Sequence, residues 1–240
     1  MRKIILYCGL LLLNTSCFAE SNCTALAKQA LKVPSIKVQT NSSNDNSETP
    51  PTLICKVAPW DVRKTILMTN DKVMLVGSVD GHIFSQGNYE IHKGFTLDDK
   101  VAIDTARYIL AQNTRAFGIR STVTSGGNHG GETDEYLALY TVAGDSIHEV
   151  LGPILVGEDD FFQSQHRNKE TTHSTSRTLA MSKIAHHGFY DIIVRTKYMM
   201  ESCSKKCSTH SIQILEFSGD HYLVSPDILK LPNECEKECW

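Results

Sequence analysis

The residues best suited to chemistry lie in one short stretch rich in glycine. His129, Glu132, Asp134 and Glu135 occur together in the segment Thr124-Ser-Gly-Gly-Asn-His-Gly-Gly-Glu-Thr-Asp-Glu135. A histidine beside carboxylates could bind a divalent metal ion, because imidazole suits zinc and oxygen ligands suit calcium. The glycines make a rigid ligand set entropically costly, and no second metal-binding spacing accompanies them. We therefore expect no metal, and we interpret the four side chains as an acidic hairpin tip that contacts a partner protein.

A second acidic group lies in Gly157-Glu-Asp-Asp-Phe-Phe162, where three carboxylates precede two aromatic rings. Paired carboxylates can serve glycoside cleavage, whereas an isolated acidic cluster in a turn is usually a solvated face. Such a cluster could also recognise a basic partner, because complementary charge speeds and directs association. Histidines follow that could titrate near neutral pH: His166, His173, His186 and His187.

The sequence lacks the motifs of the common enzyme classes. It contains no Gly-x-Ser-x-Gly elbow, no His-Glu-x-x-His pair and no glycine-rich phosphate loop before a helix. No cysteine stands beside a histidine as a catalytic nucleophile would. These observations favour a protein that is not an enzyme and uses no cofactor. The alternative is an envelope hydrolase that works through histidine and carboxylate side chains.

One segment near the C-terminus has a resemblance. Ser218-Gly-Asp-His-Tyr222 resembles the Ser-Gly-x-x-Tyr signature of the periplasmic lysozyme inhibitors, with matches at Ser218, Gly219 and Tyr222. Those inhibitors are small, disulfide-linked, mainly β proteins that plug the cleft of the enzyme with residues of this loop. The resemblance covers five residues and implies that the three matched residues bind a partner. The alternative is that Ser218-Gly-Asp forms the turn of the last hairpin while Tyr222 packs into the sheet.

The N-terminal residues have the pattern of a secretory signal peptide. A short basic head precedes an apolar run over Ile4–Leu13, and the small residues Cys17 and Ala19 follow. The run is too short to span a bilayer, which needs about 20 residues. We expect cleavage near Ala19 and a periplasmic mature protein. A lipid anchor at Cys17 is the less favoured alternative, because Asn14 takes the place of the leucine that lipoprotein signals normally have there.

Charge restricts the class of partner. The chain carries 24 basic and 27 acidic side chains, and the expected cleavage removes two of the basic ones. Nucleic acid binding requires a basic stripe, and anionic lipid likewise attracts basic segments. We therefore expect neither as a partner, and no later apolar run reaches transmembrane length.

Six cysteines remain after the expected cleavage: Cys23, Cys55, Cys203, Cys207, Cys235 and Cys239. An even number in an exported chain predicts disulfides, because the periplasm is oxidising. Cys23 and Cys55 form the natural N-terminal pair. Of the other four, we expect Cys203 and Cys207 to pair with Cys235 and Cys239, in an order that the sequence leaves open. The alternative is a zinc site made by those four thiolates, whose spacing permits it.

Short apolar runs separated by glycine and aspartate predict a mainly β protein. Asn22 can cap a short helix over Cys23–Lys32, whereas Phe117–Val142 reads as strand, loop and strand. Leu97–Ala111 fits either a helix or two short strands, and we favour strands. The expected fold is an antiparallel β-sandwich or irregular barrel of successive hairpins, with a short N-terminal helix and a disulfide-linked C-terminal end.

Four regions follow from these patterns. Residues 1–19 are the signal peptide, 20–38 a short helical segment, 39–52 a flexible polar linker without apolar side chains, and 53–240 a single β-rich domain. Polar hairpin tips on a rigid sheet are a common place for recognition. We expect an exported, non-catalytic module that binds another protein, such as an inhibitor or immunity protein that neutralises an envelope-targeting toxin or hydrolase. Alternatives are the hydrolase named above and a structural or stress-related envelope protein with an unknown ligand.

Overall fold

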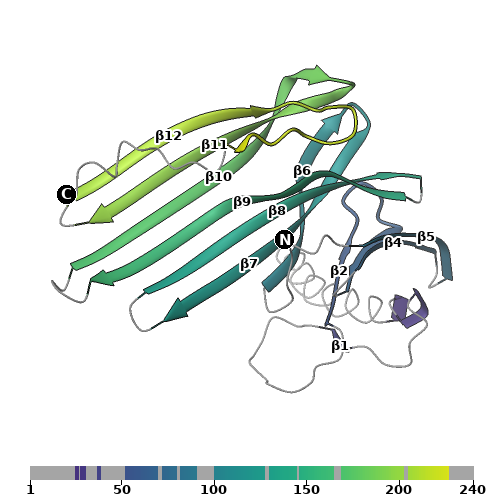
Figure 1. The fold of residues 1–240 in the computed structure, drawn as a ribbon. Coiled ribbons are helices and arrows are strands. Elements are labelled where there is room, and N and C mark those ends of the chain that lie inside the picture. Colours follow the sequence, from purple (N-terminus) through teal and green to yellow (C-terminus); the bar gives the residue numbers. More distant parts are fainter. Residues whose placement is uncertain are drawn as a thin grey trace, which may run out of the picture. The chain divides into compact units, whose positions relative to one another are not determined.

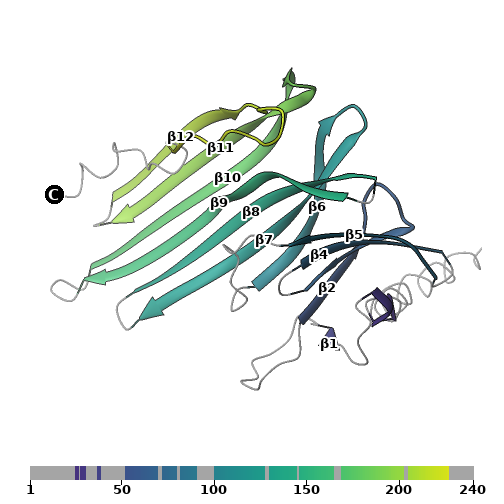
Figure 2. The ribbon, with the colours of Figure 1, turned by 45° about the vertical axis from the view of Figure 1, so that its right-hand side comes forward.

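The structure is a computed structural model of the 240-residue chain. It describes residues 25, 26, 28–30, 37–38, 52–69, 72–79, 82–90, 100–127, 130–144, 146–164, 169–202 and 205–226. The chain divides into two compact units, residues 1–91 with 144–147, and the remainder. Each unit is built on one β-sheet (Figures 1 and 2).

The first unit contains a five-stranded sheet and a few helical residues. Residues 25, 26 and 28–30 are helical. The strands lie in sequence order, with β1 and β2 parallel and every other pair antiparallel. Isoleucine, leucine and valine side chains of β3 and β4 are buried to form its core. The strands are β1 (Lys37–Val38), β2 (Thr52–Val57), β3 (Lys64–Met68), β4 (Lys72–Val79) and β5 (His82–Glu90).

The second unit contains seven strands in the order β12-β11-β10-β9-β8-β7-β6, so every strand lies beside its neighbour in sequence. Only two to four residues separate consecutive strands, a spacing that suits antiparallel neighbours. The strands are β6 (Lys100–Ala111), β7 (Thr114–Gly127), β8 (Gly130–Ala143), β9 (Ser146–Ser164), β10 (Lys169–His186), β11 (Phe189–Ser202) and β12 (Lys205–Leu215).

The seven-stranded sheet curves so that its first strand approaches strands that are not its hydrogen-bonding neighbours. β6 contacts β10 and β11, although three and four strands separate them in the sheet order. A register shift between Asp104 and Tyr108 accompanies this bend, as β-bulges usually do. One face of the sheet therefore encloses an apolar core.

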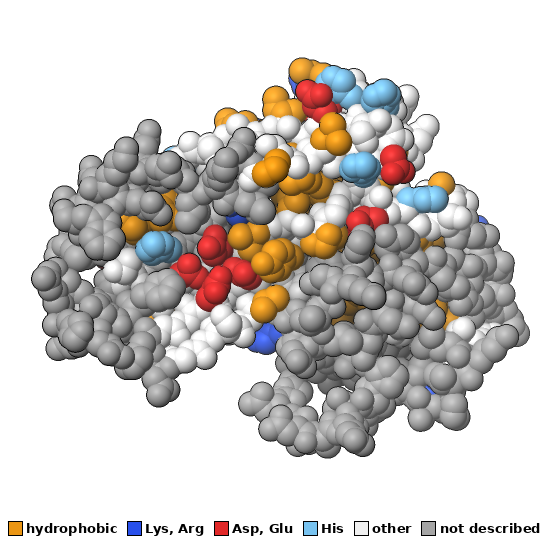
Figure 3. Space-filling view, in the orientation of Figure 1, with side chains coloured by type: hydrophobic (Ala, Val, Ile, Leu, Met, Phe, Trp, Pro, Cys, Tyr) orange, Lys and Arg blue, Asp and Glu red, His pale blue; other side chains and the backbone are white. Residues whose placement is uncertain are grey.

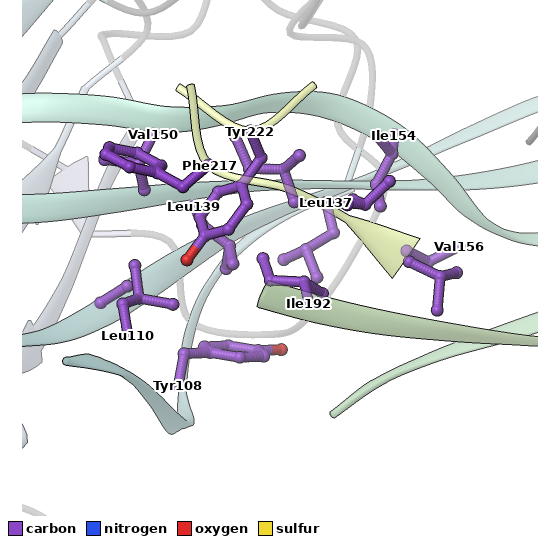
Figure 4. Close-up of a cluster of buried hydrophobic side chains, with 14 residues drawn as sticks. Tyr108, Leu110, Leu137, Leu139, Val150, Ile154, Val156, Ile192, Phe217 and Tyr222 are labelled. Carbon is purple, nitrogen blue, oxygen red and sulfur yellow. The ribbon is translucent and has the colours of Figure 1, made fainter. Parts of the chain in front are cut away.

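That core gathers side chains from most strands of the second unit. Figure 4 shows Tyr108 and Leu110 of β6 directed toward Leu137 and Leu139 of β8, with Ile192 of β11 beside them. Burial alternates along β11, as expected for a strand with one face on a core. The result is that residues widely separated in sequence share one buried surface.

The segment after β12 folds back onto the same core. Phe217 and Tyr222 form an isolated antiparallel bridge, and their rings make an edge contact with centroids 5.1 Å apart. The Tyr222 amide donates to the Val150 carbonyl at 2.7 Å, and its hydroxyl donates to the Tyr190 carbonyl at 2.7 Å. This segment is thereby attached to both β9 and β11.

The expectation of a mainly β fold with a small helix is confirmed, as two largely antiparallel sheets. Leu97–Ala111 forms strand rather than helix from residue 100 onward, but as one bulged strand instead of two. The prediction that residues 124–135 form a glycine-rich loop is wrong, because it makes the loop too long. The β7–β8 ladder continues to Gly127 opposite Gly130, because glycine adopts extended conformations without steric cost.

Several expectations fall on other parts of the chain. The signal peptide, the linker over residues 39–51, and Cys23, Cys203, Cys235 and Cys239 lie outside the described residues. The cysteine pairing therefore stays a prediction. Residues 53–240, expected as one domain, include strands of both compact units. Within the described residues, no helix is long and apolar enough to cross a membrane.

Candidate functional site

The chemically richest part of the described structure is a cluster of carboxylates on β8 and β9. Glu132 and Asp134 of β8 and Glu158 of β9 each offer an oxygen atom, and these atoms lie within 4.8 Å of one another. We call these three residues, together with Asp160 of β9, the acidic cluster. Figure 3 shows acidic side chains gathered beside apolar ones on one face of the molecule.

The carboxylates of the acidic cluster hinder one another's ionisation. Burial raises the pKa of Glu158, and the charges of Asp160 and Asp134 raise it further, while the charge of Arg177 opposes this effect. Burial likewise raises the pKa of Asp160, and the charges of Asp134 and Asp159 add to this effect, while His173 opposes it. Like charges held close together in a partly buried place disfavour the charged form.

Little in the described structure compensates this negative charge. Tyr136 donates its hydroxyl to Asp134 Oδ2 at 3.1 Å. Asp134 Oδ1 and Asp160 Oδ1 are buried without a hydrogen-bond partner among the described residues. No described lysine or arginine forms an ion pair with the cluster. The cluster therefore retains acceptor atoms for a positively charged group.

An aromatic and imidazole pair borders the acidic cluster. His173 of β10 lies opposite Asp160 in the β9–β10 register. Its Nδ1 lies 3.2 Å from the hydroxyl of the buried Tyr198, and the two rings meet edge to face. Because these strands pair along their length, the cluster is held on a sheet surface rather than on a free loop.

Two kinds of ligand suit this arrangement. Three carboxylate oxygens are the donor type that calcium prefers, so Glu132, Asp134 and Glu158 could hold a divalent cation. A lysine or arginine side chain of another protein would equally supply positive charge and N–H donors to the same oxygens.

Glu135, although adjacent in sequence, belongs to a different network. It accepts from Arg120 Nη1 at 2.9 Å, while Arg120 Nε donates to Asp104 at 2.7 Å. Tyr108 also donates to Asp104, at 2.8 Å. Burial alone would raise the pKa of Asp104, but hydrogen bonds from the Ala106 amide, Arg120 and Tyr108 lower it. Glu135 thus ties β8 to β7 and β6.

The Ser218–Tyr222 segment combines an exposed turn with a buried ring. Ser218 Oγ donates to the His221 carbonyl at 2.7 Å, and Gly219 has a φ of 106°, which favours glycine. Tyr222 is only 2% exposed. This is the arrangement of a hairpin turn with its tyrosine packed in the sheet. Of the three residues that match the inhibitor signature, only Ser218 and Gly219 are exposed to a partner.

Of the residues expected at a partner-binding site, the structure brings only Glu132 and Asp134 together; His129 lies outside the described residues. Glu158, Asp160 and His173 were not predicted from the sequence to lie beside these two residues. The available signal was the acidic run before Phe161, but nothing in it indicates which strand it pairs with.

Comparison with known protein families, with curated proteins and with solved structures gives no match. The function is therefore inferred from the acidic cluster itself, which is the described part of the chain with the clearest capacity to bind.

Proposed function

We propose that this protein is an exported, non-catalytic binding module that recognises a basic segment of a partner protein through the acidic cluster. The observation that carries the proposal is the close approach of carboxylate oxygens from Glu132, Asp134 and Glu158, within 4.8 Å, with no described lysine or arginine paired to them. A basic side chain would relieve their mutual repulsion and satisfy the free oxygens of Asp134 and Asp160.

The position of the cluster on paired strands supports recognition. Strands hold side chains in fixed geometry, so a partner's charge can be matched without first ordering a loop. Complementary charge also accelerates association and rejects acidic competitors. The exposed Ser218 and Gly219 of the last turn form a second proposed contact, since the resemblance to lysozyme inhibitors places partner contacts there.

The proposal also includes the cellular compartment of the protein and the class of binding protein to which it belongs. Export by a signal peptide cleaved near Ala19 and residence in the periplasm remain part of it. Disulfide bonds among the six cysteines are also part of the proposal, and the disulfide-bonded state of Cys55 and Cys207 supports them. An inhibitor or immunity protein would combine these features, and an envelope hydrolase stays the alternative.

A pull-down from a periplasmic extract tests the proposal. We compare the wild-type protein with the double variant Asp134→Asn/Glu158→Gln and with Glu201→Gln/Glu216→Gln, which removes two exposed charges elsewhere. We expect the wild type and the control to retain one stoichiometric basic partner at about 0.1 M salt and to release it near 1 M, where charge is screened. The cluster variant should not retain it.

The proposal would be contradicted if all three proteins retained the partner equally, or if they captured only an acidic partner. The absence of any stoichiometric partner from extracts of strains that encode envelope-targeting toxins would also contradict it.

A second candidate is cation binding by the same three carboxylates. Native mass spectrometry in calcium would show one retained ion in the wild type and none in the double variant. Retention of calcium together with loss of partner binding after chelation would make the cation, rather than the carboxylates alone, the recognition element.

A further inference from the structure

A pocket of about 320 Å³ lies on the concave side of the seven-stranded sheet. It is lined by residues 106–108 of β6, Arg120 of β7 and residues 177–181 of β10. β6 and β10 meet here only because the sheet curves. A volume of this size is at the lower end of the range for small-molecule sites.

Arg177 is the unusual member of this lining. Arg177 is only 6% exposed to solvent. Nη1 donates to the Leu155 carbonyl at 3.1 Å, whereas Nε has no hydrogen-bond partner. No described carboxylate lies within ion-pairing distance of its guanidinium. A buried guanidinium stays protonated. The negative charge of Glu158 acts on it without forming an ion pair.

The other two arginines of the lining differ from Arg177 in their surroundings. Arg120 already pairs with Asp104 at 2.7 Å and with Glu135 at 2.9 Å. Arg107 is exposed at the rim. The pocket therefore has an excess of positive charge, and the buried part of that excess belongs to Arg177.

Apart from Tyr108 and Thr178, the remaining lining is apolar. Leu179 and Met181 line the pocket and also pack against the core of the second unit, while Ala106 and Ala180 complete the wall. Small and flexible apolar side chains leave space that a short hydrocarbon chain could fill. A site that places one positive charge within an apolar surface is suited to an amphipathic anion.

We propose that this pocket binds a small organic monocarboxylate, with its carboxylate against Arg177 and its hydrocarbon chain against Leu179 and Met181. The planar guanidinium matches a carboxylate in shape and charge. Asp104 and Glu135, which hold Arg120, disfavour a second negative charge in the same space. None of the acidic-cluster residues lines the pocket, although the charge of Glu158 acts on Arg177, so the proposal holds whether or not a basic partner exists.

Isothermal titration of the purified protein with octanoate, octanol and octyl phosphate tests the site. We expect octanoate to bind about tenfold or more tightly than the neutral octanol, because only the anion pairs with Arg177. Arg177→Met should remove this preference, whereas Arg195→Met, at an exposed position of β11, should leave it unchanged. Octanol binding as tight as that of octanoate would overturn the proposal, as would tighter binding of octyl phosphate.

A second variant protects the test against loss of folding. Ala106→Trp fills the pocket from an exposed rim position and keeps Arg177 in place. We expect it to abolish octanoate binding while its circular dichroism spectrum matches that of the wild type. Unchanged octanoate affinity in this variant would place the ligand elsewhere and refute the assignment of the pocket.

Discussion

Glu158 illustrates how a side chain of the proposed binding site can lower the stability of the fold. It ionises in a partly buried place beside Asp134 and Asp160, and these surroundings raise its pKa above the ordinary value. The folded protein therefore holds the Glu158 proton more tightly than the unfolded chain does. By linkage, the stability of the fold falls as pH rises from the unfolded pKa of Glu158 through its folded pKa.

We predict that Glu158→Gln stabilises the protein at pH 7, by about 0.5 kcal/mol, the scale of interactions between partly exposed charges. The gain should shrink as the pH falls below 4.5, the ordinary pKa of a glutamate side chain, because the wild-type carboxyl is then protonated as well. Urea unfolding at pH 7 and pH 4 measures both. The exposed Glu201→Gln should show no such trend, and a gain of equal size at both pH values would contradict the explanation.

At the scale of the strands, the close approach of β6, β7 and β8 depends on Gly118, which has no side chain. A Cβ added at Gly118 would lie 2.7 Å from Leu137 Cδ1 and 3.1 Å from Asp104 Cβ. Leu137 is fully buried in the core and has little room to move. Gly127, at the far end of the same strand, has nothing within 4 Å of such an atom.

We predict that Gly118→Ala lowers the free energy of unfolding by about 1–3 kcal/mol, the usual cost of overpacking. Gly127→Ala should be neutral or slightly stabilising, because it only restricts the unfolded chain. Thermal unfolding of both variants provides the comparison. If the two variants unfolded at the same temperature, the close packing at Gly118 would not be what holds these strands.

Strand pairing at this scale was partly predictable. Short apolar runs, with glycine and aspartate between them, indicate most of the hairpins. The ladder between Gly127 and Gly130 was not predictable, since glycine-rich sequence normally indicates a loop. The long β7–β8 ladder continues in register into that segment. Local sequence propensity cannot predict this, because it does not describe the pairing between strands.

At the scale of the whole second unit, the segment after β12 links strands β9 and β11 through hydrogen bonds. The ring of Tyr222 packs in the apolar core, and its hydroxyl donates to the Tyr190 carbonyl of β11. Its amide donates to Val150 of β9, two strands away in the sheet order. Burial raises the pKa of the Tyr222 phenol, which therefore stays a donor over the physiological range.

We predict that Tyr222→Phe destabilises this unit by about 1–2 kcal/mol, because a buried carbonyl loses its partner while the ring remains. Ser218→Ala removes only a hydrogen bond within the exposed turn and should cost well under half as much. Chemical denaturation of the two variants tests the difference. A larger effect from Ser218→Ala would mean that the turn, and not the tyrosine, fastens the end of the chain.

The sequence by itself determined the mainly β class, most hairpin positions and an even set of cysteines, because these follow from local patterns of apolar, glycine and cysteine residues. Only the tertiary structure decided that Glu158 joins Glu132 and Asp134, that Glu135 turns instead to Arg120, and that Arg177 faces a pocket beside β6. Each of these contacts depends on strand register and on the curvature of a seven-stranded sheet. Those properties arise from the packing of all the strands together, so no short stretch of the chain encodes them.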